Sequence, residues 1–442
     1  MSTAVIMAGG KGTRLQSIAK DIPKPMFPIL GKPILEYQID SLKRSGIIDI
    51  ILIIGYLGDM IRDHFGDGET YGVNIRYIAE DKPLGSAGSL YYLKADKSLG
   101  IAEGDGLVMK EDFFLVFGDL LLDIDWNRFI SFHKQRRGLV TLYVHSNTHP
   151  YDSDVIVVDT DDRVLRIEPK NMKRDFFYHN LVNAGVYCIS PRLLDGISDP
   201  VKMDFEKELV APQVINGTVY AYKSTEYVKD MGTPERLQAV SEDVRNGIVE
   251  SRSLRNKQKA IFLDRDGTIN VFKGFLRKAE DFELYPDTAE AIRRINTSEY
   301  LAIVVTNQPV VARGECSYEE LEQIHAKMET LLGKAGVYID DLFFCPHHPD
   351  KGFAGEILEL KINCDCRKPK IGMLVKAAKR YNIDLERSWY IGDSTLDIQT
   401  GMNAQMKTVL LKTGVGGLDG KFDVRPEFVA DNLLEAVTRI LE

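Results

Sequence analysis

The chain has 442 residues, of which 44% are hydrophobic and 27% are charged, and its formal net charge is −9. At about 100 to 200 residues per domain, this length predicts two or three domains that each bury a core. Apolar runs such as residues 47–55 are shorter than the roughly 18 residues of a membrane span. Charges of both signs are interspersed, without the basic stripe of a nucleic-acid-binding surface. We therefore expect a soluble multidomain protein with neither a membrane nor nucleic acid as its partner.

The N-terminal residues MSTAVIMAGG leave no room for a charged segment, an apolar segment and a cleavage site. We therefore expect a cytoplasmic protein, in which thiols stay reduced. Three of the five cysteines cluster with two histidines in the C-terminal half: Cys345, His347, His348, Cys364 and Cys366. Grouped Cys and His residues in such a protein indicate a metal site rather than a disulfide framework.

The first 120 residues alternate between strand and helix patterns. Residues 3–8 and 48–55 are apolar runs typical of buried strands, residues 34–46 form an amphipathic helix pattern, and residues 113–119 are a further strand that ends in an acid. Apolar strands separated by helices indicate a parallel sheet covered on both faces. Ligands of such sheets bind beyond the carboxyl ends of the strands, so the loop at 8–14 and Asp119 should face one crevice.

Shorter alternating segments between residues 138 and 227 indicate a mixed region of the sheet. A charged helical pattern then runs to about residue 258, where a second series of apolar strands begins. We predict two Rossmann-like α/β domains, the first with a mixed, mostly parallel sheet. The expected boundaries are 1–240 and 259–442, with a linker helix at 241–258.

A glycine-rich loop with built-in cations follows the first strand. It comprises Ala8, Gly9, Gly10, Lys11, Gly12, Thr13 and Arg14. Glycines let the main chain approach a ligand closely, while Lys11 and Arg14 supply positive charge for a triphosphate. The alternative is a tight strand-to-helix turn, which the cations in the loop and Lys24 nearby disfavour. The loop does not end in Gly-Lys followed by Ser or Thr, so it is not a P-loop.

With this loop, residues 1–240 resemble the sugar-phosphate nucleotidyltransferases. The resemblance is carried by AGGKGTRL at 8–15, KPM at 24–26, PLGSAGSL at 83–90, FGD at 117–119, NAG at 183–185 and KDMGTPERL at 229–237. It implies that a sugar 1-phosphate oxygen attacks the α-phosphorus of a nucleoside triphosphate and releases pyrophosphate. Mg²⁺ would be held by Asp119 and Asp230, with Arg14 and Lys24 offsetting the phosphate charge. Read singly, Asp119 could be a polar strand end and Asp230 an ordinary loop acid.

The same resemblance assigns the residues around the nucleotide and the sugar. Gly85, Ser86 and Gly88 would recognise the base or ribose, and Asn183 and Gly185 would contact the sugar. Family members commonly read Glu-Lys-Pro where the sugar and its phosphate are gripped. This chain reads Glu-Pro-Lys at Glu168 to Lys170, so Lys170 is displaced by one position and the proline restricts the main chain there.

The C-terminal part resembles the haloacid dehalogenase superfamily through DRDGT at 264–268, Thr306, Lys368 and IGDSTLD at 391–397. The resemblance implies that Asp264 is the nucleophile that forms an aspartyl-phosphate, and that Asp266 is the general acid and base. Mg²⁺ would be bound by Asp264, Asp393 and the main-chain carbonyl of Asp266. Thr306 and Lys368 would hold the phosphate oxygens, and Asp397 would orient these groups. No large cap insertion is evident, which favours a small substrate.

The cysteine cluster offers three thiolates and an imidazole, from Cys345, His347, Cys364 and Cys366. This set completes a tetrahedral zinc site with no open position, so the zinc would be structural. His348 is an alternative ligand to His347, and cysteines buried as small hydrophobic residues are the alternative to a metal site. A closed site here would fix the loop that carries Lys368.

Within the superfamily, CPHHP, CDCRKP and TNQPVVARGE resemble the zinc-bearing phosphatases of D-glycero-D-manno-heptose 1,7-bisphosphate or of histidinol phosphate. Asn307, Arg313 and Arg367 would contact the rest of the substrate. A heptose phosphatase produces the sugar 1-phosphate that a nucleotidyltransferase consumes, so the two resemblances together predict a bifunctional enzyme of nucleotide-activated heptose synthesis. Fusion to this transferase type points to GTP and to GDP-D-glycero-α-D-manno-heptose, for a lipopolysaccharide or S-layer glycan.

Two alternatives stay open. One is a mannose or glucose 1-phosphate nucleotidyltransferase joined to a histidinol-phosphatase-like domain. The other makes one half a non-catalytic sensor of sugar nucleotides or phosphates, which the intact acids disfavour. A homo-oligomer is also left open.

Overall fold

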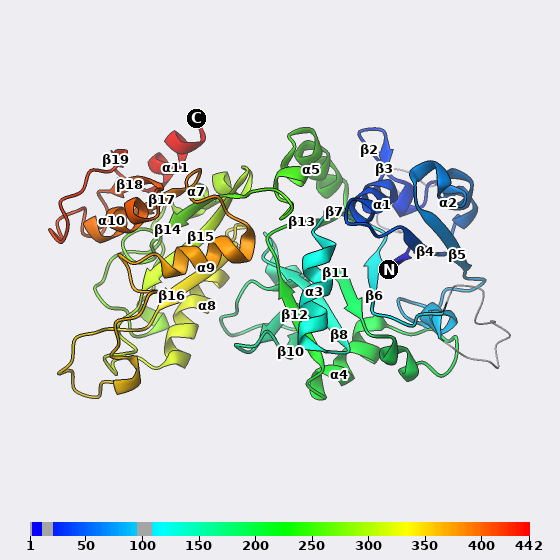
Figure 1. The fold of residues 1–442 in the computed structure, drawn as a ribbon, viewed down its shortest axis with the longest axis horizontal. Coiled ribbons are helices and arrows are strands. Elements are labelled where there is room, and N and C mark those ends of the chain that lie inside the picture. The colour runs from blue at the N-terminus through cyan, green and yellow to red at the C-terminus, as the bar shows by residue number, and fades with distance from the viewer. Residues whose placement is uncertain (1, 11–20, 95–107) are drawn as a thin grey trace. The chain divides into compact units, whose positions relative to one another are not determined.

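The computed structural model describes residues 2–10, 21–94 and 108–442. The chain divides into two compact units. The first consists of Met1–Val144, Ile156–Glu168 and Asn183–Ser253, and the second of His145–Val155, Pro169–Val182 and Leu254–Glu442. The expected α/β class is confirmed in both units (Figure 1).

The first unit is built on a mixed sheet whose central strands are β1 (Thr3–Met7), β4 (Asp49–Ile54) and β6 (Phe113–Phe117). Strand β1 runs parallel to both β4 and β6, and β11 (Val182–Ile189) joins β6 in the antiparallel sense. The central residues of these strands are fully buried, including Val5, as expected for a sheet covered on both faces. The strand path within the described residues is β10-β9-β11-β6-β1-β4-β5, with β8 attached to β11 and β12 to β8.

The first unit contains further strands and several helices. The strands are β2 (Pro28–Ile29), β3 (Lys32–Pro33), β5 (Asn74–Ala79), β7 (Leu120–Asp123), β8 (Val140–His145), β9 (Val155–Val158), β10 (Val164–Glu168), β12 (Val219–Lys223) and β13 (Tyr227–Asp230). The helices are α1 (Ile34–Arg44), α2 (Gly58–Phe65), α3 (Trp126–Arg136), α4 (Ala211–Ile215), α5 (Pro234–Arg245) and α6 (Ile248–Ser251).

The second unit contains a parallel sheet in the order β16-β15-β14-β17-β18-β19. Its strands are β14 (Lys259–Leu263), β15 (Tyr300–Asn307), β16 (Asp341–Cys345), β17 (Trp389–Gly392), β18 (Lys407–Leu411) and β19 (Phe428–Ala430). Its helices are α7 (Thr288–Asn296), α8 (Tyr318–Lys334), α9 (Gly372–Tyr381), α10 (Thr395–Asn403) and α11 (Leu433–Leu441).

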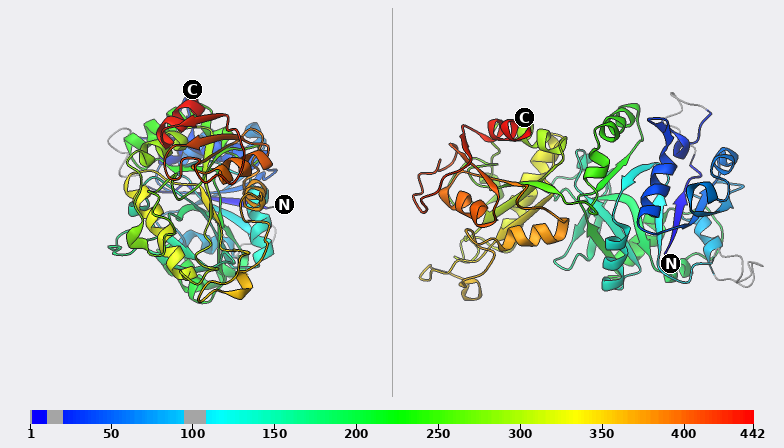
Figure 2. Two further views of the ribbon diagram at one scale, coloured as in Figure 1. Left: turned by 90° about the vertical axis from the view of Figure 1, so that its left-hand side faces the viewer. Right: turned by 45° about the horizontal axis from the view of Figure 1, so that its top comes forward.

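Alternate residues of β14 face two different cores. Ile261 and Leu263 pack with buried residues of α7, α8 and α11, whereas Ala260 and Phe262 pack with buried residues of α9. Helices therefore cover both faces of this sheet, as Figure 2 also shows. Because both faces of the sheet are buried, its strands are continuous apolar runs in the sequence.

Helix α8 is joined to residues that precede the second sheet in the chain by about 80 positions. Tyr178 donates its main-chain N–H to the hydroxyl of Thr330 at 2.9 Å, and the Thr330 hydroxyl donates back to the Tyr178 carbonyl at 3.1 Å. The main chain of Asn180 donates to Glu329 at 2.7 Å. These paired contacts explain why Pro169–Val182 belongs to the second unit.

The imidazole of His179 lies between two carboxylates of α8, with Nδ1 2.8 Å from Glu329 and Nε2 3.1 Å from Glu322. Carboxylates only accept hydrogen bonds, so both ring nitrogens donate and the ring is an imidazolium. Burial opposes this charge, but Glu329 and Glu322 outweigh it and raise the pKa of His179 to about 10.

We predict that His179 stabilises the second unit most below pH 6.5. The pKa of His179 is higher in the folded chain than in the unfolded chain, so its charged form stabilises the fold. This stabilisation is complete below the unfolded pKa and is lost as the pH rises towards 10. The Tm difference between the wild-type chain and His179→Asn should therefore be largest near pH 6 and shrink by pH 10. Because 43% of the side chain is exposed, we expect a modest effect. The control is His64→Asn on α2, and an equal difference at both pH values would contradict the prediction.

The predicted linker helix at 241–258 differs from the structure. Helix α5 ends at Arg245, and Gly247 adopts a left-handed conformation with φ of 72° that separates α5 from α6. Residues 252–258 lie outside any helix. The sequence pattern missed this break because glycine tolerates positive φ within an otherwise helical composition. The boundary between the units at Ser253 and Leu254 lies inside the predicted linker, and the domain limits at 240 and 259 stay predictions.

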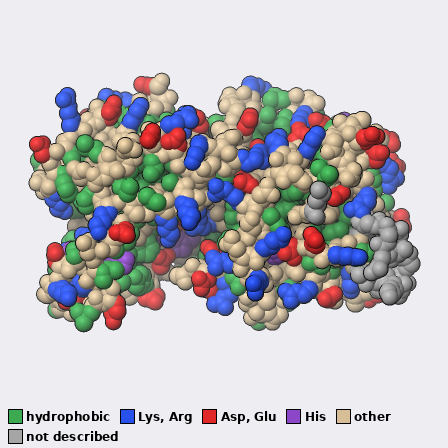
Figure 3. Space-filling model, in the orientation of Figure 1, with side chains coloured by type: hydrophobic (Ala, Val, Ile, Leu, Met, Phe, Trp, Pro, Cys, Tyr) green, Lys and Arg blue, Asp and Glu red, His purple; other side chains and the backbone are tan. Residues whose placement is uncertain are grey.

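No helix in the described part of the chain is long and apolar enough to span a membrane. On the face that Figure 3 shows, basic and acidic side chains are interspersed across the described residues.

Candidate active sites and a cysteine–histidine cluster

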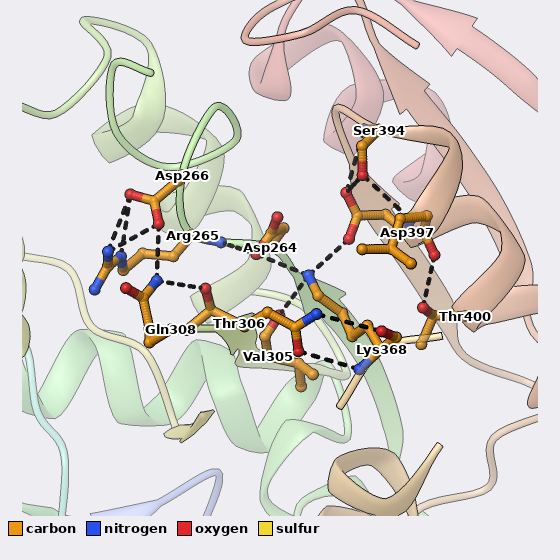
Figure 4. Close-up of polar contacts among 12 residues, drawn as sticks. Asp264, Arg265, Asp266, Val305, Thr306, Gln308, Lys368, Ser394, Asp397 and Thr400 are labelled. Carbon is orange, nitrogen blue, oxygen red and sulfur yellow. Dashed lines mark hydrogen bonds and ion pairs between the residues drawn. The ribbon is translucent and has the colours of Figure 1, made fainter. Parts of the chain in front are cut away.

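Polar side chains gather at the carboxyl edge of the second sheet. Asp264 follows β14, Thr306 lies near the end of β15, and Asp393 follows β17. Because these strands are parallel neighbours, their carboxyl ends meet at one edge, and Figure 4 shows Asp264, Thr306 and Lys368 close together. The predicted phosphatase residues are thus brought to one place by the topology.

Lys368 is buried at the centre of this group. Its ammonium lies 2.9 Å from Asp264 and 2.7 Å from Asp397, and it donates to the Val305 carbonyl at 3.2 Å. Burial disfavours the charged ammonium, but Asp264 and Asp397 outweigh it and raise the pKa of Lys368 well above its usual value. Asp397 itself accepts a hydrogen bond from the Ser394 hydroxyl at 2.5 Å, so it holds Lys368 in place.

The carboxylate of Asp266 faces a set of donors that the sequence did not single out. The fully buried Arg265 donates to Asp266 at 2.8 Å, and Gln308 donates to it at 2.8 Å and to Thr306 at 2.9 Å (Figure 4). Burial opposes ionisation of Asp266, but Arg265 and the hydrogen bonds outweigh it and lower its pKa. The only sequence signal for Arg265 and Gln308 was that they lie within the DRDGT and TNQPVVARGE segments.

Three carboxylates, those of Asp264, Asp393 and Asp397, lie with their oxygens within 4.8 Å of one another. Burial raises the pKa of Asp264 to about 7 against the attraction of Lys368. Burial also raises the pKa of Asp393 to about 8, and the nearby Asp264 and Asp397 add to the rise. Carboxylates this close cannot all ionise without another cation, so their chemistry fits a hard divalent ion.

Two glycines with positive φ allow the main chain to approach Asp393 closely. A Cβ at Gly267 would lie 2.3 Å from an Asp393 oxygen, and one at Gly414 would lie 1.9 Å from it. The main-chain N–H of Val415 donates to the same carboxylate at 2.7 Å. Asp393 is therefore fixed by main-chain groups. Asp266 was expected to ligate through its main-chain carbonyl, and this stays a prediction.

The cysteine–histidine cluster closes around a common centre. The separations between Sγ and Nδ1 atoms include 3.6 Å for Cys345–Cys364, 3.1 Å for Cys364–Cys366 and 3.3 Å for His347–Cys366. A tetrahedral zinc ion with bonds of about 2.3 Å separates its sulfur ligands by about 3.8 Å, so the four atoms fit such an ion once the closest pair, Cys364 and Cys366, moves apart by about 0.7 Å.

The second histidine points elsewhere. His348 Nε2 lies 3.2 Å from the guanidinium of Arg313, and His347 is the histidine that joins the cluster. Arg367 donates to the His347 carbonyl at 3.1 Å, and Lys368 follows it directly. Asn307 accepts from the Lys368 main-chain N–H at 3.1 Å, so the predicted substrate residue Asn307 helps to fix the Lys368 loop.

In the first unit, Asp119 and Asp230 come together through an antiparallel pair. Strand β13 pairs with β7 so that Asp230 lies opposite Leu120, and Met231 donates to the Asp119 carbonyl at 3.3 Å. The carboxylate of Asp119 accepts from Lys24 at 2.7 Å. Arg236, which the sequence did not single out, binds both oxygens of Asp230 at 2.7 and 2.8 Å.

Part of the glycine-rich loop is described. Gly118 donates to the Met7 carbonyl at 3.0 Å, so the residues before Asp119 run beside the start of the loop at Ala8, Gly9 and Gly10. A second group of predicted loop residues lies outside the described residues: Lys11, Gly12, Thr13 and Arg14.

Gly85, Ser86 and Gly88 have structural partners. A Cβ at Gly85 would lie 2.3 Å from the Met203 carbonyl oxygen, and one at Gly88 would lie 2.0 Å from the Val201 carbonyl oxygen. The Ser86 hydroxyl accepts from the Phe205 N–H at 2.8 Å. Close main-chain packing accounts for these glycines, and their recognition of a nucleotide stays a prediction.

Asn183 belongs to a polar cluster with a residue that the sequence did not reveal. It donates to Glu206 at 2.6 Å and to the Tyr187 hydroxyl at 2.9 Å, and its oxygen accepts from the Gly185 N–H at 3.2 Å. Glu206 lies in a π-helical turn, Phe205–Val210, and no sequence pattern pointed to it.

Glu168 and Lys170 lie in different units. Glu168 ends β10 in the first unit and pairs with Arg166, whereas Lys170 belongs to the second unit and donates its main-chain N–H to Asp154 at 2.7 Å. Their shared role at the sugar stays a prediction.

Both sites bring charged side chains together near strand ends, and comparison with known proteins indicates the class of protein. A family model for the nucleotidyl transferases matches residues 3–247, and a model for the HAD-like hydrolases matches residues 365–436. The chain belongs to the nucleotidyl transferase family through its N-terminal half, and its C-terminal half is a HAD-like phosphatase. The expected bifunctional enzyme is thus confirmed.

Particular relatives match each half. The chain is 41% identical over 158 residues to the D-glycero-beta-D-manno-heptose-1,7-bisphosphate 7-phosphatase of Pasteurella multocida (strain Pm70), covering 36% of this chain and 83% of that protein. It is 31% identical over 254 residues to the mannose-1-phosphate guanylyltransferase of Mycobacterium tuberculosis (strain ATCC 25618 / H37Rv), covering 57% of this chain and 67% of that protein. A solved structure of HddC from Yersinia pseudotuberculosis complexed with GMP-PN is 26% identical and covers 55% of this chain and 100% of that chain, with a TM-score of 0.46.

Proposed function

We propose that the C-terminal unit removes the 7-phosphate of D-glycero-D-manno-heptose 1,7-bisphosphate, and that the N-terminal half transfers GMP from GTP to the resulting heptose 1-phosphate. The products are GDP-heptose, pyrophosphate and inorganic phosphate. The observation that carries the proposal is the union in one chain of a half related to heptose bisphosphate phosphatases and a half related to a guanylyltransferase. The phosphatase half makes the kind of sugar 1-phosphate that the guanylyltransferase half consumes.

In the phosphatase reaction, Asp264 attacks the phosphorus of the 7-phosphate while the bond to the heptose oxygen breaks. Asp266 donates a proton to that oxygen, and then takes a proton from the water that hydrolyses the aspartyl-phosphate. A bound phosphate dianion disfavours the carboxylate form of Asp266, which lets it carry the first proton. Lys368 and Thr306 hold the phosphate oxygens.

Asp264 and Asp393, with the main-chain carbonyl of Asp266, would hold Mg²⁺ in this site. A bound Mg²⁺ would supply positive charge that offsets the repulsion between the phosphate and these carboxylates. Asp397 keeps Lys368 beside Asp264, and Arg313 and Arg367 bind the rest of the substrate.

In the transferase reaction, the heptose 1-phosphate oxygen attacks the α-phosphorus of GTP, and the bond to pyrophosphate breaks. Asp119 and Asp230 would hold Mg²⁺, which would supply charge to the phosphates. In the described structure these acids are paired with Lys24 and Arg236, so we propose that both cations turn to the phosphates when the substrates bind. Arg14 stabilises the transferring phosphate.

We propose that Cys345, His347, Cys364 and Cys366 hold one structural zinc ion. We predict that Cys366→Ser loses the zinc, lowers the Tm of the second unit by about 5 to 15 °C and reduces phosphatase activity, since Lys368 lies two residues away. Zinc content, thermal unfolding and phosphate release measure these three effects. Cys316→Ala, at a buried cysteine outside the cluster, should keep its zinc. A Cys366→Ser variant with full zinc and unchanged Tm would contradict the assignment.

Mannose 1-phosphate is the second candidate substrate of the transferase, because the guanylyltransferase relative is named for it. Purified chain should be assayed for pyrophosphate release with each nucleoside triphosphate and with mannose 1-phosphate, glucose 1-phosphate and both anomers of heptose 1-phosphate. The proposal predicts the highest kcat/KM for GTP with a heptose 1-phosphate. A higher value for mannose 1-phosphate would favour the second candidate.

A further inference from the structure

Two arginines, Arg313 and Arg367, lie beside the cysteine–histidine cluster. Within the described residues, neither Arg313 nor Arg367 forms an ion pair, although Arg277 pairs with Glu315 at 2.7 Å and Lys361 with Glu356 at 3.3 Å. Both guanidinium groups are half-buried. Removing a charge from water without a partner is costly, so the pair is suited to an anion that arrives from outside the protein.

Arg313 lies against two aromatic rings. Its guanidinium carbon lies 4.4 Å from the centre of the Phe275 ring and 4.6 Å from that of Phe353. Such contacts stabilise a cation without neutralising it. An aromatic ring offers no strong hydrogen-bond acceptor, so these contacts alone do not set the directions of the guanidinium N–H groups.

His348 provides a hydrogen bond that sets the direction of one of these N–H groups. Its Nε2 atom lies 3.2 Å from Nη2 of Arg313. A guanidinium only donates hydrogen bonds, so Nε2 is the acceptor and His348 is neutral, with its proton on Nδ1. The His348 side chain is 7% exposed, and its main-chain N–H donates to the Leu360 carbonyl at 3.2 Å, so the acceptor is itself fixed.

The segment that carries His348 also contacts the main chain next to Arg313 and the side chain of Arg367. The Ala312 N–H, next to Arg313, donates to the Pro346 carbonyl at 3.3 Å. Arg367 donates to the carbonyl of His347 at 3.1 Å. One short loop therefore positions both cations.

We infer that His348 is a positioning residue, which aims Arg313 at the phosphate of a bisphosphate substrate that does not react. This inference rests on the proposed phosphatase function. It gives the second histidine of the CPHHP sequence a role that differs from the ligand role of the first. A substrate with a single phosphate would not use the contact.

The test compares His348→Leu, which removes the acceptor, with His348→Gln, whose Oε1 can occupy the place of Nε2. The substrates are D-glycero-D-manno-heptose 1,7-bisphosphate and p-nitrophenyl phosphate, which has one phosphate. We expect His348→Leu to raise KM for the bisphosphate about tenfold, with kcat and p-nitrophenyl phosphate hydrolysis within about twofold of wild type, as for loss of one charge-assisted hydrogen bond. His348→Gln should recover most of the loss, and zinc content should stay unchanged in both variants.

A double-mutant cycle with Arg313→Ala separates positioning from a structural role. If His348 acts through Arg313, adding His348→Leu to Arg313→Ala should not raise KM further. Additive effects, or equal losses on both substrates, would overturn the inference. A wild-type chain that does not prefer the bisphosphate to p-nitrophenyl phosphate would instead count against the proposed function, so the two failures are distinguishable.

Discussion

Asp264→Asn should abolish phosphate release from heptose 1,7-bisphosphate, with kcat lowered at least about 1,000-fold. The amide cannot act as the nucleophile that forms the aspartyl-phosphate, and removal of a nucleophile eliminates the step that it performs. The change also removes one of the three carboxylates near Lys368, whose ammonium lies 2.9 Å from Asp264. Phosphate release at saturating substrate measures the effect.

The same variant should keep its transferase activity. Pyrophosphate release from GTP and heptose 1-phosphate should stay within about twofold of wild type, because Asp264 belongs to the second unit. Asp431→Asn, at an acid whose side chain is 69% exposed and pairs with Lys412, is the matched control and should retain both activities. A phosphatase rate in Asp264→Asn near that of the wild type would refute the assignment of the nucleophile.

Asp119→Asn should lower nucleotidyl transfer about 100-fold or more while phosphate release is retained. Asp119 and Asp230 are the proposed Mg²⁺ ligands, and a carboxamide offers no negative charge to a hard cation. Pyrophosphate release over a range of Mg²⁺ concentrations measures both kcat and the apparent metal affinity. We expect the Mg²⁺ concentration at half-maximal rate to rise.

Asp59→Asn on α2 is the matched control for this change, since its side chain is 92% exposed. Loss of the 2.7 Å contact between Lys24 and Asp119 frees the Lys24 ammonium, so a purely structural role of Asp119 would show as a lower Tm. If Asp119→Asn unfolds at the wild-type temperature and transfers GMP at the wild-type rate, Asp119 is not a metal ligand.

Local sequence patterns were sufficient to predict which acids lie at strand ends. Asp264 and Asp119 each follow a continuous apolar run, and parallel topology brings such ends to one edge. The cysteine cluster was predictable for a similar reason, because Cys364 and Cys366 are close in sequence and match a ligand set. The structure selects His347 over His348, a choice that depended on side-chain direction.

Other contacts at the candidate sites depend on side-chain directions and long-range pairing that local sequence patterns do not reveal. Arg265 and Gln308 converge on Asp266 from two strand ends, and a buried arginine has no distinct local pattern. Glu206 reaches Asn183 from a π-helical turn, which composition does not reveal. The inclusion of residues 169–182 in the second unit rests on pairing with α8, more than 140 positions along the chain.

The order of the two reactions is the central claim, and one assay tests it directly. Purified chain is mixed with heptose 1,7-bisphosphate and GTP, and phosphate, pyrophosphate and GDP-heptose are measured together. We predict equal amounts of the three products from the wild-type chain. Asp264→Asn should form none of them from the bisphosphate, but should form pyrophosphate and GDP-heptose when heptose 1-phosphate is supplied. GDP-heptose 7-phosphate as the product of Asp264→Asn, or phosphate release without any sugar nucleotide in the wild type, would contradict the account.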